Sequence, residues 1–336
     1  MQTQINSSSK ESKTTPTIMR AAVLTAPGKL EVQTVPVPMP GPGEVRIKLE
    51  GSGLCASNIP VWEGRDWFEY PVAAGNPGHE GWGTIEALGE GVTNFQIGNR
   101  VACLSYHAYA EFDVAKAEEV VRLPAELDGL PFPGEPLGCA MNIFHRSEIQ
   151  KGHKVAIVGA GFLGLLLIQL AKFAGAEVIA ISKRDYSLQA ASEAGADHLI
   201  PLDDHYAIIK KVEKITAGTC CDRVIEVTGK EWPLNLSIEL TKVRGKLIVA
   251  GFHQDGMRQV NVQELNWKGI DMISAHERDP QQYIQGIQKA IDAIKNGQMD
   301  PFPLFTHVFP LEKASEAFEH LQNRPDGFIK AILTNT

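Results

Sequence analysis

The stretch KVAIVGAGFLG, residues 154–164, decides the fold of this chain. Its first half, Lys154–Val158, is a compact apolar run that predicts a buried strand. The glycines that follow predict a tight turn, and the largely apolar run from Leu165 to Ala174 predicts a helix directly after it. A strand, a glycine-rich turn and a helix in this order predict a dinucleotide-binding unit.

The motif GAGFLG gives each glycine a separate task in such a unit. Gly159 permits the turn, Gly161 lets backbone N–H groups approach a pyrophosphate, and Gly164 lets the helix pack on the strand. The helix N-terminus adds a partial positive charge. A glycine-rich packing turn is the alternative, but the strand–helix units that follow favour nucleotide binding. We therefore assign to the cofactor site Gly159, Gly161, Phe162, Leu163 and Gly164.

Strands and helices alternate after this motif. Alternation at this length predicts a parallel, doubly wound sheet of the Rossmann type. The expected strands are 177–182, 198–201, 222–227, 246–250 and 270–274, and the expected helices between them are 185–194, 205–216 and 232–240.

Short β-type runs separated by Gly and Pro fill the chain from Met19 to Gly138. Because no long helix lies between them, they predict an antiparallel, barrel-like domain. A helix at 275–297, and short strands around one further helix, end the chain. We predict an α/β protein with a Rossmann sheet inserted into a barrel-like domain. Its parts are a disordered polar leader at 1–17, the barrel-like domain at 18–138 and again at 275–336, and the Rossmann domain at 139–274.

The composition is that of a globular protein, with 43% apolar and 21% charged residues. The net charge of −8 argues against nucleic acid or an anionic membrane as a partner, because phosphate binding needs a positive surface. No apolar run is long enough to span a bilayer. Five cysteines, an odd number without a signal peptide, indicate a reducing cytoplasm and no disulfide framework.

The end of the second Rossmann strand indicates which nucleotide binds. A sheet that binds NAD places Asp or Glu there to accept hydrogen bonds from the ribose 2′-OH. This chain has Ser182 there, followed by Lys183 and Arg184. A hydroxyl and two cations suit a 2′-phosphate, so we expect NADP(H) to be preferred over NAD(H). The alternative is that Lys183 and Arg184 are a solvated surface pair.

Four residues have the chemistry of an open catalytic zinc site. His79 and Glu80 stand side by side between two glycines, Cys55 lies upstream and Glu135 downstream. A thiolate, an imidazole and carboxylates are ligands that zinc accepts, and a catalytic site keeps one position open.

The order of these motifs resembles one family. GLCASN (53–58), GHEG (78–81), FQIGNRV (95–101), EPL (135–137) and GAGFLG follow one another as in the zinc-dependent medium-chain dehydrogenase/reductase family. Within it, the chain resembles the sorbitol and sugar-alcohol dehydrogenase branch from about residue 19 to residue 334. The resemblance implies a GroES-like catalytic domain split by a Rossmann domain, in a homodimer or homotetramer.

The resemblance also implies a mechanism. Cys55, His79 and Glu80 look like zinc ligands, Glu135 either ligates zinc or holds the zinc-bound water, and Ser57 relays the substrate proton. Whether Glu80 or Glu135 lies on the metal at rest stays open. We expect a hydride to pass between NADP(H) and an alcohol, polyol or sugar. A zinc-free quinone or enoyl reductase that uses NADPH, and a non-catalytic NADP(H)-binding protein, are the alternatives.

The chain departs from the family in three places. The four-cysteine lobe that holds a structural zinc is absent, so we expect one zinc at most. Asn58 stands where the family usually has an Asp that partners the ligand His. We expect this neutral amide to orient the imidazole but to leave it less basic, so that the affinity for zinc is lower than usual. Pro60 replaces a histidine of the proton relay, so protons must leave by water or by another group.

Three further residues are assigned to the cofactor site. Thr228 and His253 each follow a Rossmann strand, and Lys330 matches a basic residue that approaches the pyrophosphate or the second shell in the family. Aromatic residues between the Cys and His ligands either line the substrate cleft or only pack the loop; these are Trp62, Trp67, Phe68 and Tyr70.

Overall fold

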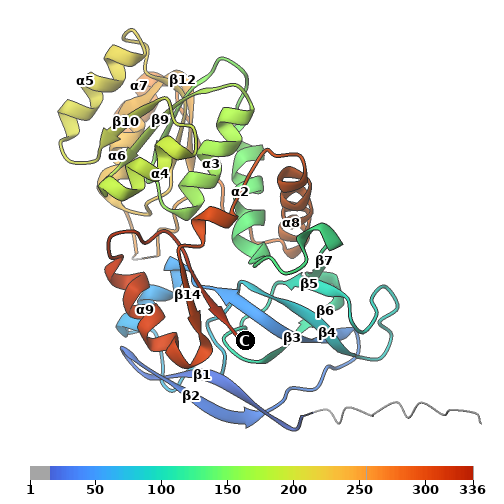
Figure 1. The fold of residues 1–336 in the computed structure, drawn as a ribbon. Coiled ribbons are helices and arrows are strands. Elements are labelled where there is room, and N and C mark those ends of the chain that lie inside the picture. Colours follow the sequence, from blue (N-terminus) through green and yellow to red (C-terminus); the bar gives the residue numbers. More distant parts are fainter. Residues whose placement is uncertain (1–15, 255, 336) are drawn as a thin grey trace, which may run out of the picture.

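The computed structural model describes residues 16–254 and 256–335. It has a parallel sheet covered by helices at one end and a mixed sheet at the other (Figure 1). Of the predicted leader, residues 1–15 lie outside the described part of the chain.

The parallel sheet has the order β10-β9-β8-β11-β12-β13, which confirms the doubly wound α/β fold. The strand order reverses between β8 and β11, and ligands of such sheets bind at this point, beyond the carboxyl ends of the strands. The strands are β8 (Lys154–Val158), β9 (Glu177–Ser182), β10 (His198–Pro201), β11 (Cys221–Glu226), β12 (Thr241–Val249) and β13 (Asp271–Ser274).

Helices cover both faces of this sheet, and residues 155–158 of β8 are accordingly all apolar and buried. Val155 and Ile157 belong to the core that includes α2 (Gly134–Ser147) and α3 (Phe162–Phe173). Ala156 and Val158 belong to the core of the opposite face, with α5 and α6. The remaining helices of this part are α4 (Asp185–Glu193), α5 (His205–Ile215), α6 (Glu231–Leu240) and α7 (Val262–Lys268).

The mixed sheet has the order β14-β15-β3-β4-β5-β7, and β6 pairs with β3. β15 lies antiparallel to β3, with Leu333 opposite Ser52. A strand that follows the parallel sheet in the sequence therefore pairs with a strand that precedes it. The Rossmann sheet is therefore inserted into this part. The strands are β3 (Glu44–Gly53), β4 (Gly81–Leu88), β5 (Arg100–Cys103), β6 (Phe112–Lys116), β7 (Val120–Arg122), β14 (His307–Pro310) and β15 (Ala331–Thr334); β1 (Ile18–Ala26) and β2 (Lys29–Pro36) form a separate hairpin.

The starts of two helices matter for the site. α2 begins at Gly134, and Pro136 is tolerated in its first turn because that position needs no hydrogen-bonded N–H. Glu135 therefore lies on a helix. α8 (Pro280–Lys295) begins later than residue 275: Asp279 caps it by accepting from the N–H of Gln281. The other helices of this part are α1 (Ile59–Glu63) and α9 (Ala314–Asn323).

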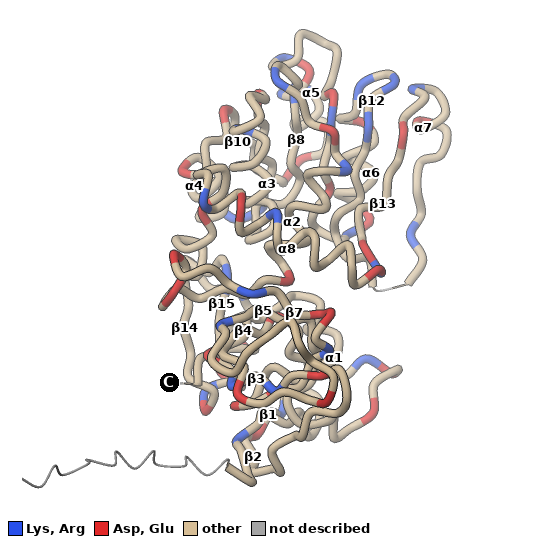
Figure 2. The backbone as a smooth tube through the Cα atoms, turned by 90° about the vertical axis from the view of Figure 1, so that its right-hand side faces the viewer, with Lys and Arg blue, Asp and Glu red and all other residues tan. Residues whose placement is uncertain are grey.

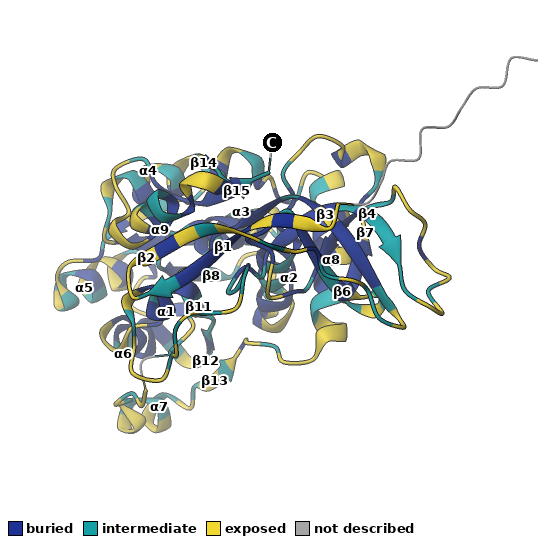
Figure 3. Ribbon diagram, turned by 90° about the horizontal axis from the view of Figure 1, so that it is seen from below, coloured by how far each residue is buried: buried dark blue, intermediate teal, exposed yellow. Residues whose placement is uncertain are grey.

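The surface agrees with the composition. Positions of Lys and Arg are interspersed with those of Asp and Glu along both parts of the chain (Figure 2). Buried residues concentrate in the strands, whereas α5 and α7 carry many exposed ones (Figure 3). No helix among the described residues is both long and apolar enough to cross a membrane.

Candidate active site

Three of the predicted ligands meet where β3 ends and β4 begins. Cys55 follows β3, and His79 and Glu80 directly precede β4. The two strands pair antiparallel, with Ser52 opposite Gly81, so these ends must lie together. The sulfur, one imidazole nitrogen and one carboxylate oxygen all lie within 4.8 Å of one another.

The orientation of His79 is set by a backbone carbonyl. Its Nδ1 lies 2.9 Å from the oxygen of Pro77. A carbonyl only accepts, so Nδ1 carries the proton and Nε2 is available as a ligand. Asn58 donates to the same oxygen at 3.3 Å and to the hydroxyl of Tyr109 at 2.7 Å. The expectation that Asn58 orients the imidazole directly is therefore wrong: it holds the carbonyl that does so.

The electrostatics around His79 favour a bound cation. Burial alone would lower the pKa of its imidazole, but the hydrogen bond and charge of Cys55, with Glu135 and Glu80, raise that pKa to about 10. Sulfur, nitrogen and oxygen donors gathered this way fit a zinc ion.

Glu80 is fully buried and forms an ion pair with the ammonium group of Lys330. The ammonium nitrogen lies 2.7 Å from Oε1, to which it donates, and 2.6 Å from Oε2. Oε2 is a buried oxygen without a hydrogen-bond donor among the described residues. The absence of a side chain at Gly53 leaves room for Oε2 of Glu80, because a Cβ at position 53 would lie 1.8 Å from this oxygen. Both oxygens of Glu80 therefore face the Lys330 ammonium, and a zinc ion bound by Glu80 would share this carboxylate with Lys330.

Lys330 connects this cluster to the nucleotide loop. Its ammonium lies 5.1 Å from the ring centroid of Phe162, the first residue of α3. The C-terminal strand region thus brings one cation to both the predicted metal site and the predicted cofactor site.

Glu135 lies outside the group of three ligand atoms but close to it. Its Oε1 accepts from the thiol of Cys139, one helical turn later, at 3.2 Å. Burial raises the pKa of Glu135, and the charge of Glu80 adds to this while His79 opposes it. Ser57 is half-buried and donates to Oδ1 of Asn58 at 3.4 Å.

The glycines of the nucleotide loop meet different surroundings. Gly159 has a φ of 110°, which favours glycine, and a Cβ there would lie 2.9 Å from Thr228. A Cβ on Gly164 would lie 2.0 Å from the oxygen of Gly159, so α3 packs on the loop itself. At Gly161 a Cβ would meet nothing within 4 Å. This open space at the uncapped start of α3 suits an anion. Leu163 is half-buried.

The residues at the end of β9 differ in what they contact. Ser182 is buried, and Lys183 is exposed and makes no hydrogen bond or ion pair within the described residues. Arg184 instead donates to the carbonyl of Phe328 at 2.6 Å. Of the two cations predicted to bind the 2′-phosphate, Lys183 is therefore the one that makes no hydrogen bond or ion pair within the described residues.

Glu226, which the sequence analysis missed, brings Thr228 and His253 together. This buried carboxylate at the end of β11 accepts from the N–H of Thr228 at 2.6 Å and that of Gly229 at 2.9 Å. Nε2 of His253 lies 2.9 Å from its other oxygen. The sequence pattern that could have identified Glu226 is an acidic residue directly after the apolar pair Val224-Ile225.

The aromatic residues of the loop after Cys55 separate into two kinds. Trp62 is buried, and its ring centroid lies 5.2 Å from that of Phe318. Trp62 therefore packs the loop and does not line an open cleft. Trp67 is exposed. A tyrosine that the sequence analysis did not consider, Tyr106, lies nearer the cluster: its exposed ring is 6.4 Å from that of His79.

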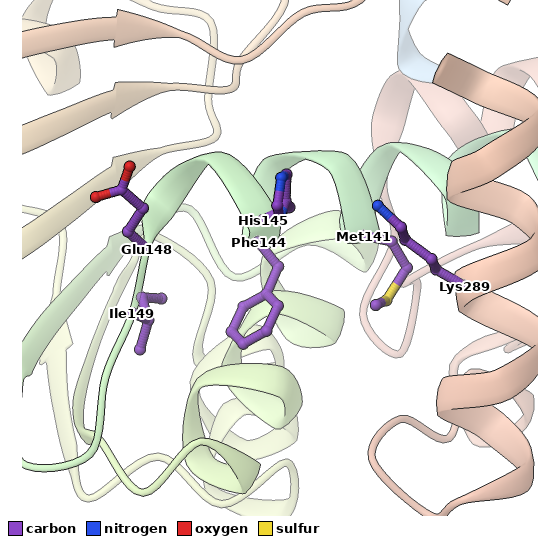
Figure 4. A pocket seen from close by; sticks show the side chains of 6 residues that line it. All are labelled: Met141, Phe144, His145, Glu148, Ile149 and Lys289. Carbon is purple, nitrogen blue, oxygen red and sulfur yellow. The ribbon is translucent and has the colours of Figure 1, made fainter. Parts of the chain in front are cut away.

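A cavity of about 410 Å³ lies elsewhere, along α2 and α8 (Figure 4). Figure 4 shows Lys289 reaching it from α8. None of its lining residues is a predicted site residue, and they do not form a ligand set for a metal, so we place the chemistry at Cys55, His79 and Glu80. The cavity is lined by Met141, Phe144, His145, Glu148, Ile149 and Lys289.

Comparisons with known proteins agree with this geometry. A family model described as alcohol dehydrogenase GroES-like domain matches residues 41–125, and one described as zinc-binding dehydrogenase matches residues 163–293. The chain is 30% identical to the sorbitol dehydrogenase of Halalkalibacterium halodurans, over 94% of this chain and 99% of that protein.

Two solved structures have the same fold. One, described as a short chain alcohol dehydrogenase from E. coli CFT073 in complex with NADH, has a TM-score of 0.84 and 23% identity, covering 95% of this chain and 100% of that one. The other, a mycobacterial protein in complex with NADPH, has a TM-score of 0.81 and 25% identity, covering 94% and 99%.

Proposed function

This chain belongs to the zinc-type medium-chain dehydrogenase/reductase family, in its sorbitol dehydrogenase branch, and we propose that it is a zinc-dependent enzyme that prefers NADP(H). It is an alcohol-type dehydrogenase that acts on CH–OH donors. One observation carries the zinc proposal: the ligand atoms of Cys55, His79 and Glu80 lie within 4.8 Å of one another.

Cys55, His79 and Glu80 would hold the zinc, and Glu135, whose charge acts on the His79 imidazole, would serve as a further ligand or hold a water. Bound zinc would supply Lewis acidity that lowers the pKa of a substrate hydroxyl. Lys330 offsets the negative charge of Glu80, which would otherwise be buried without a partner. Ser57 takes up the substrate proton and passes it to water, since Pro60 offers no relay group.

The nucleotide would lie across the start of α3, with its pyrophosphate at the open position beside Gly161. Ser182 and Lys183 would bind the 2′-phosphate, and Arg184, Thr228 and His253 would border the cofactor. The comparisons include complexes with NADH and with NADPH, so the preference rests on the end of β9. The metal-ligand set of Cys55, His79 and Glu80 favours this proposal over both alternatives, a zinc-free quinone or enoyl reductase and a non-catalytic NADP(H)-binding protein.

We also propose a homodimer or homotetramer, located in the cytoplasm. β13 is an edge strand of the parallel sheet, and exposed apolar side chains flank it. Met272 within β13 is 41% exposed, and Trp267 on α7, the helix that precedes this strand in the sequence, is 86% exposed. A second copy that pairs with β13 would cover them. The cytoplasmic location is proposed from cysteine usage, since the five cysteines are an odd number and none is paired in a disulfide.

Turnover measurements test the function. Purified protein should reduce NADP⁺ with at least one member of a panel of secondary alcohols, polyols and sugars. A chelator should remove both zinc and activity, and added zinc should restore activity. Turnover that survives complete zinc removal would refute the zinc mechanism, and a lack of turnover with the whole panel would refute the function.

A further inference from the structure

A buried carboxylate joins the ends of two neighbouring strands of the parallel sheet. Glu226, the last residue of β11, is fully buried. Its Oε1 accepts from the backbone N–H groups of Thr228 at 2.6 Å and Gly229 at 2.9 Å, and from the hydroxyl of Thr228. Its Oε2 lies 2.9 Å from Nε2 of His253, which follows β12. One side chain therefore fixes both the segment after β11 and the segment after β12.

The groups that hydrogen-bond to this carboxylate within the described residues are all donors. Arg258 donates from its Nε to Nδ1 of His253 at 3.3 Å. Nδ1 therefore carries no proton, and Nε2 carries the proton that it donates to Glu226. An amide at position 226 would turn its NH₂ group toward a donor on one side or the other, unless His253 changed tautomer and turned an N–H toward Arg258. The arrangement therefore requires a carboxylate.

The two segments also touch through their backbones. A Cβ on Gly251 would lie 2.2 Å from the nitrogen of Gly229 and 2.8 Å from Oε2 of Glu226. The N–H of Gly251 donates to the carbonyl of Glu226 at 2.8 Å. The segment after β11 packs on the nucleotide loop as well, since a Cβ on Gly159 would lie 2.9 Å from the methyl carbon of Thr228. The position of the carboxylate is thereby linked to the proposed cofactor site.

The strand order indicates which part of a dinucleotide lies over these segments. A doubly wound sheet consists of two halves that each bind one mononucleotide, and the dinucleotide crosses where the strand order reverses. Here the reversal lies between β8 and β11. The proposed 2′-phosphate site is at the end of β9, so the adenosine half belongs to β8, β9 and β10. The segments after β11 and β12 then face the nicotinamide half.

We propose that Glu226 is a positioning residue, which together with His253 holds segments 227–229 and 250–253 in the conformation that binds the nicotinamide half of the cofactor. This inference rests on the proposed function, because it takes a dinucleotide as the ligand. Since Glu226 is fully buried, it acts through these segments rather than by contact with the nucleotide. Its replacement should weaken binding of the nicotinamide half and leave binding of the adenosine half unchanged.

Calorimetric titration tests this with two probes, NADPH and 2′,5′-ADP, which consists of the adenosine half alone. We expect Glu226→Gln and His253→Leu to raise the Kd for NADPH about tenfold, the effect of a buried hydrogen-bonding group left unpaired, and the Kd for 2′,5′-ADP by less than about twofold. His253→Gln keeps an N–H donor and should stay within about threefold of wild type for NADPH. Glu213→Gln, which changes an exposed carboxylate on α5, is the matched control and should leave both constants unchanged.

The outcomes separate this inference from the proposed function. Both probes bind without turnover, so the result does not depend on zinc; if the wild type binds only NADH, then NADH and ADP replace the two probes. If the wild type binds neither NADPH nor NADH, the proposed function fails and this inference with it. An unchanged Kd for NADPH in Glu226→Gln and His253→Leu, or an equal rise for NADPH and 2′,5′-ADP, overturns this inference alone. If one variant fails to fold, the other decides.

Discussion

At the scale of single residues, Glu80 and Lys330 form the most deeply buried ion pair of the described part of the chain. Removal of one partner leaves a charge without water or counter-ion. We predict that Lys330→Met destabilises the protein by about 3–5 kcal/mol. Chemical denaturation of the purified protein measures this.

The matched control for that substitution is Lys29→Met. Lys29 pairs with Glu31 at 2.7 Å on the surface, where solvent screens the interaction. The control should change stability by at most about 1 kcal/mol. Equal effects of the two substitutions would show that Glu80 does not depend on Lys330.

The protonation of the His79 imidazole determines how we expect zinc binding to depend on pH. Although burial opposes its charge, Cys55, Glu135 and Glu80 raise the pKa of the metal-free imidazole to about 10, above the unfolded value of about 6.5. The proton therefore stabilises the metal-free fold below about pH 6.5, and that contribution is lost as the pH rises toward 10.

Zinc must displace this proton, so its apparent affinity should rise at least about tenfold per pH unit between roughly pH 6 and 8. Competition with a chromophoric chelator measures it. His276→Asn serves as control, because His276 is not one of the three ligand residues and burial lowers the pKa of its imidazole. A zinc affinity that stays flat over this range would contradict the expected protonation of His79.

At the scale of elements, the close contact of α2 and α8 predicts whether Gly286→Ala stabilises or destabilises the protein. Gly286→Ala would raise helix propensity by up to about 1 kcal/mol. The new methyl group, however, would lie 2.7 Å from the oxygen of Gly138, and such overpacking costs about 1–3 kcal/mol.

We predict net destabilisation, measured from the denaturation midpoint. Exposed Gln288 on the same helix is the control, and Gln288→Ala should lie within about 0.5 kcal/mol of wild type. A Gly286→Ala protein more stable than wild type would mean that the helices do not touch there.

The end of β9 gives the second test at this scale. Ser182→Asp with Lys183→Ile would repel a 2′-phosphate and supply an acceptor for the ribose hydroxyl of NAD. We predict that the NADP-to-NAD ratio of kcat/KM falls by at least about tenfold, the equivalent of about 1.4 kcal/mol.

Lys210→Ile, an exposed change on α5, controls for the loss of one positive charge and should leave this ratio unchanged. A double variant that keeps the wild-type ratio would show that β9 does not select the nucleotide.

At the scale of the whole molecule, features that depend on local sequence were predictable. The apolar run Lys154–Val158 and the glycines after it specify a buried strand and a turn through side-chain periodicity and backbone conformation. The fold class follows from them. The residues Cys55, His79 and Glu80 were found because the order of motifs resembles a known family.

Features that depend on contacts between distant segments were not predictable. The pair of Glu80 and Lys330 joins residues 250 positions apart. Gly286 lies against the backbone of Gly138 although the two glycines belong to different helices. Neither contact leaves a pattern in the sequence near its members, since both depend on how the sheets and helices pack.

The central claim, a catalytic zinc ion held at Cys55, is tested most directly by metal analysis with parallel turnover. The account predicts about one zinc ion per chain in the wild type and in a Cys220→Ser control, which lies away from the cluster. It predicts no zinc and no turnover in Cys55→Ser. A Cys55→Ser protein that keeps its zinc and its activity would contradict it.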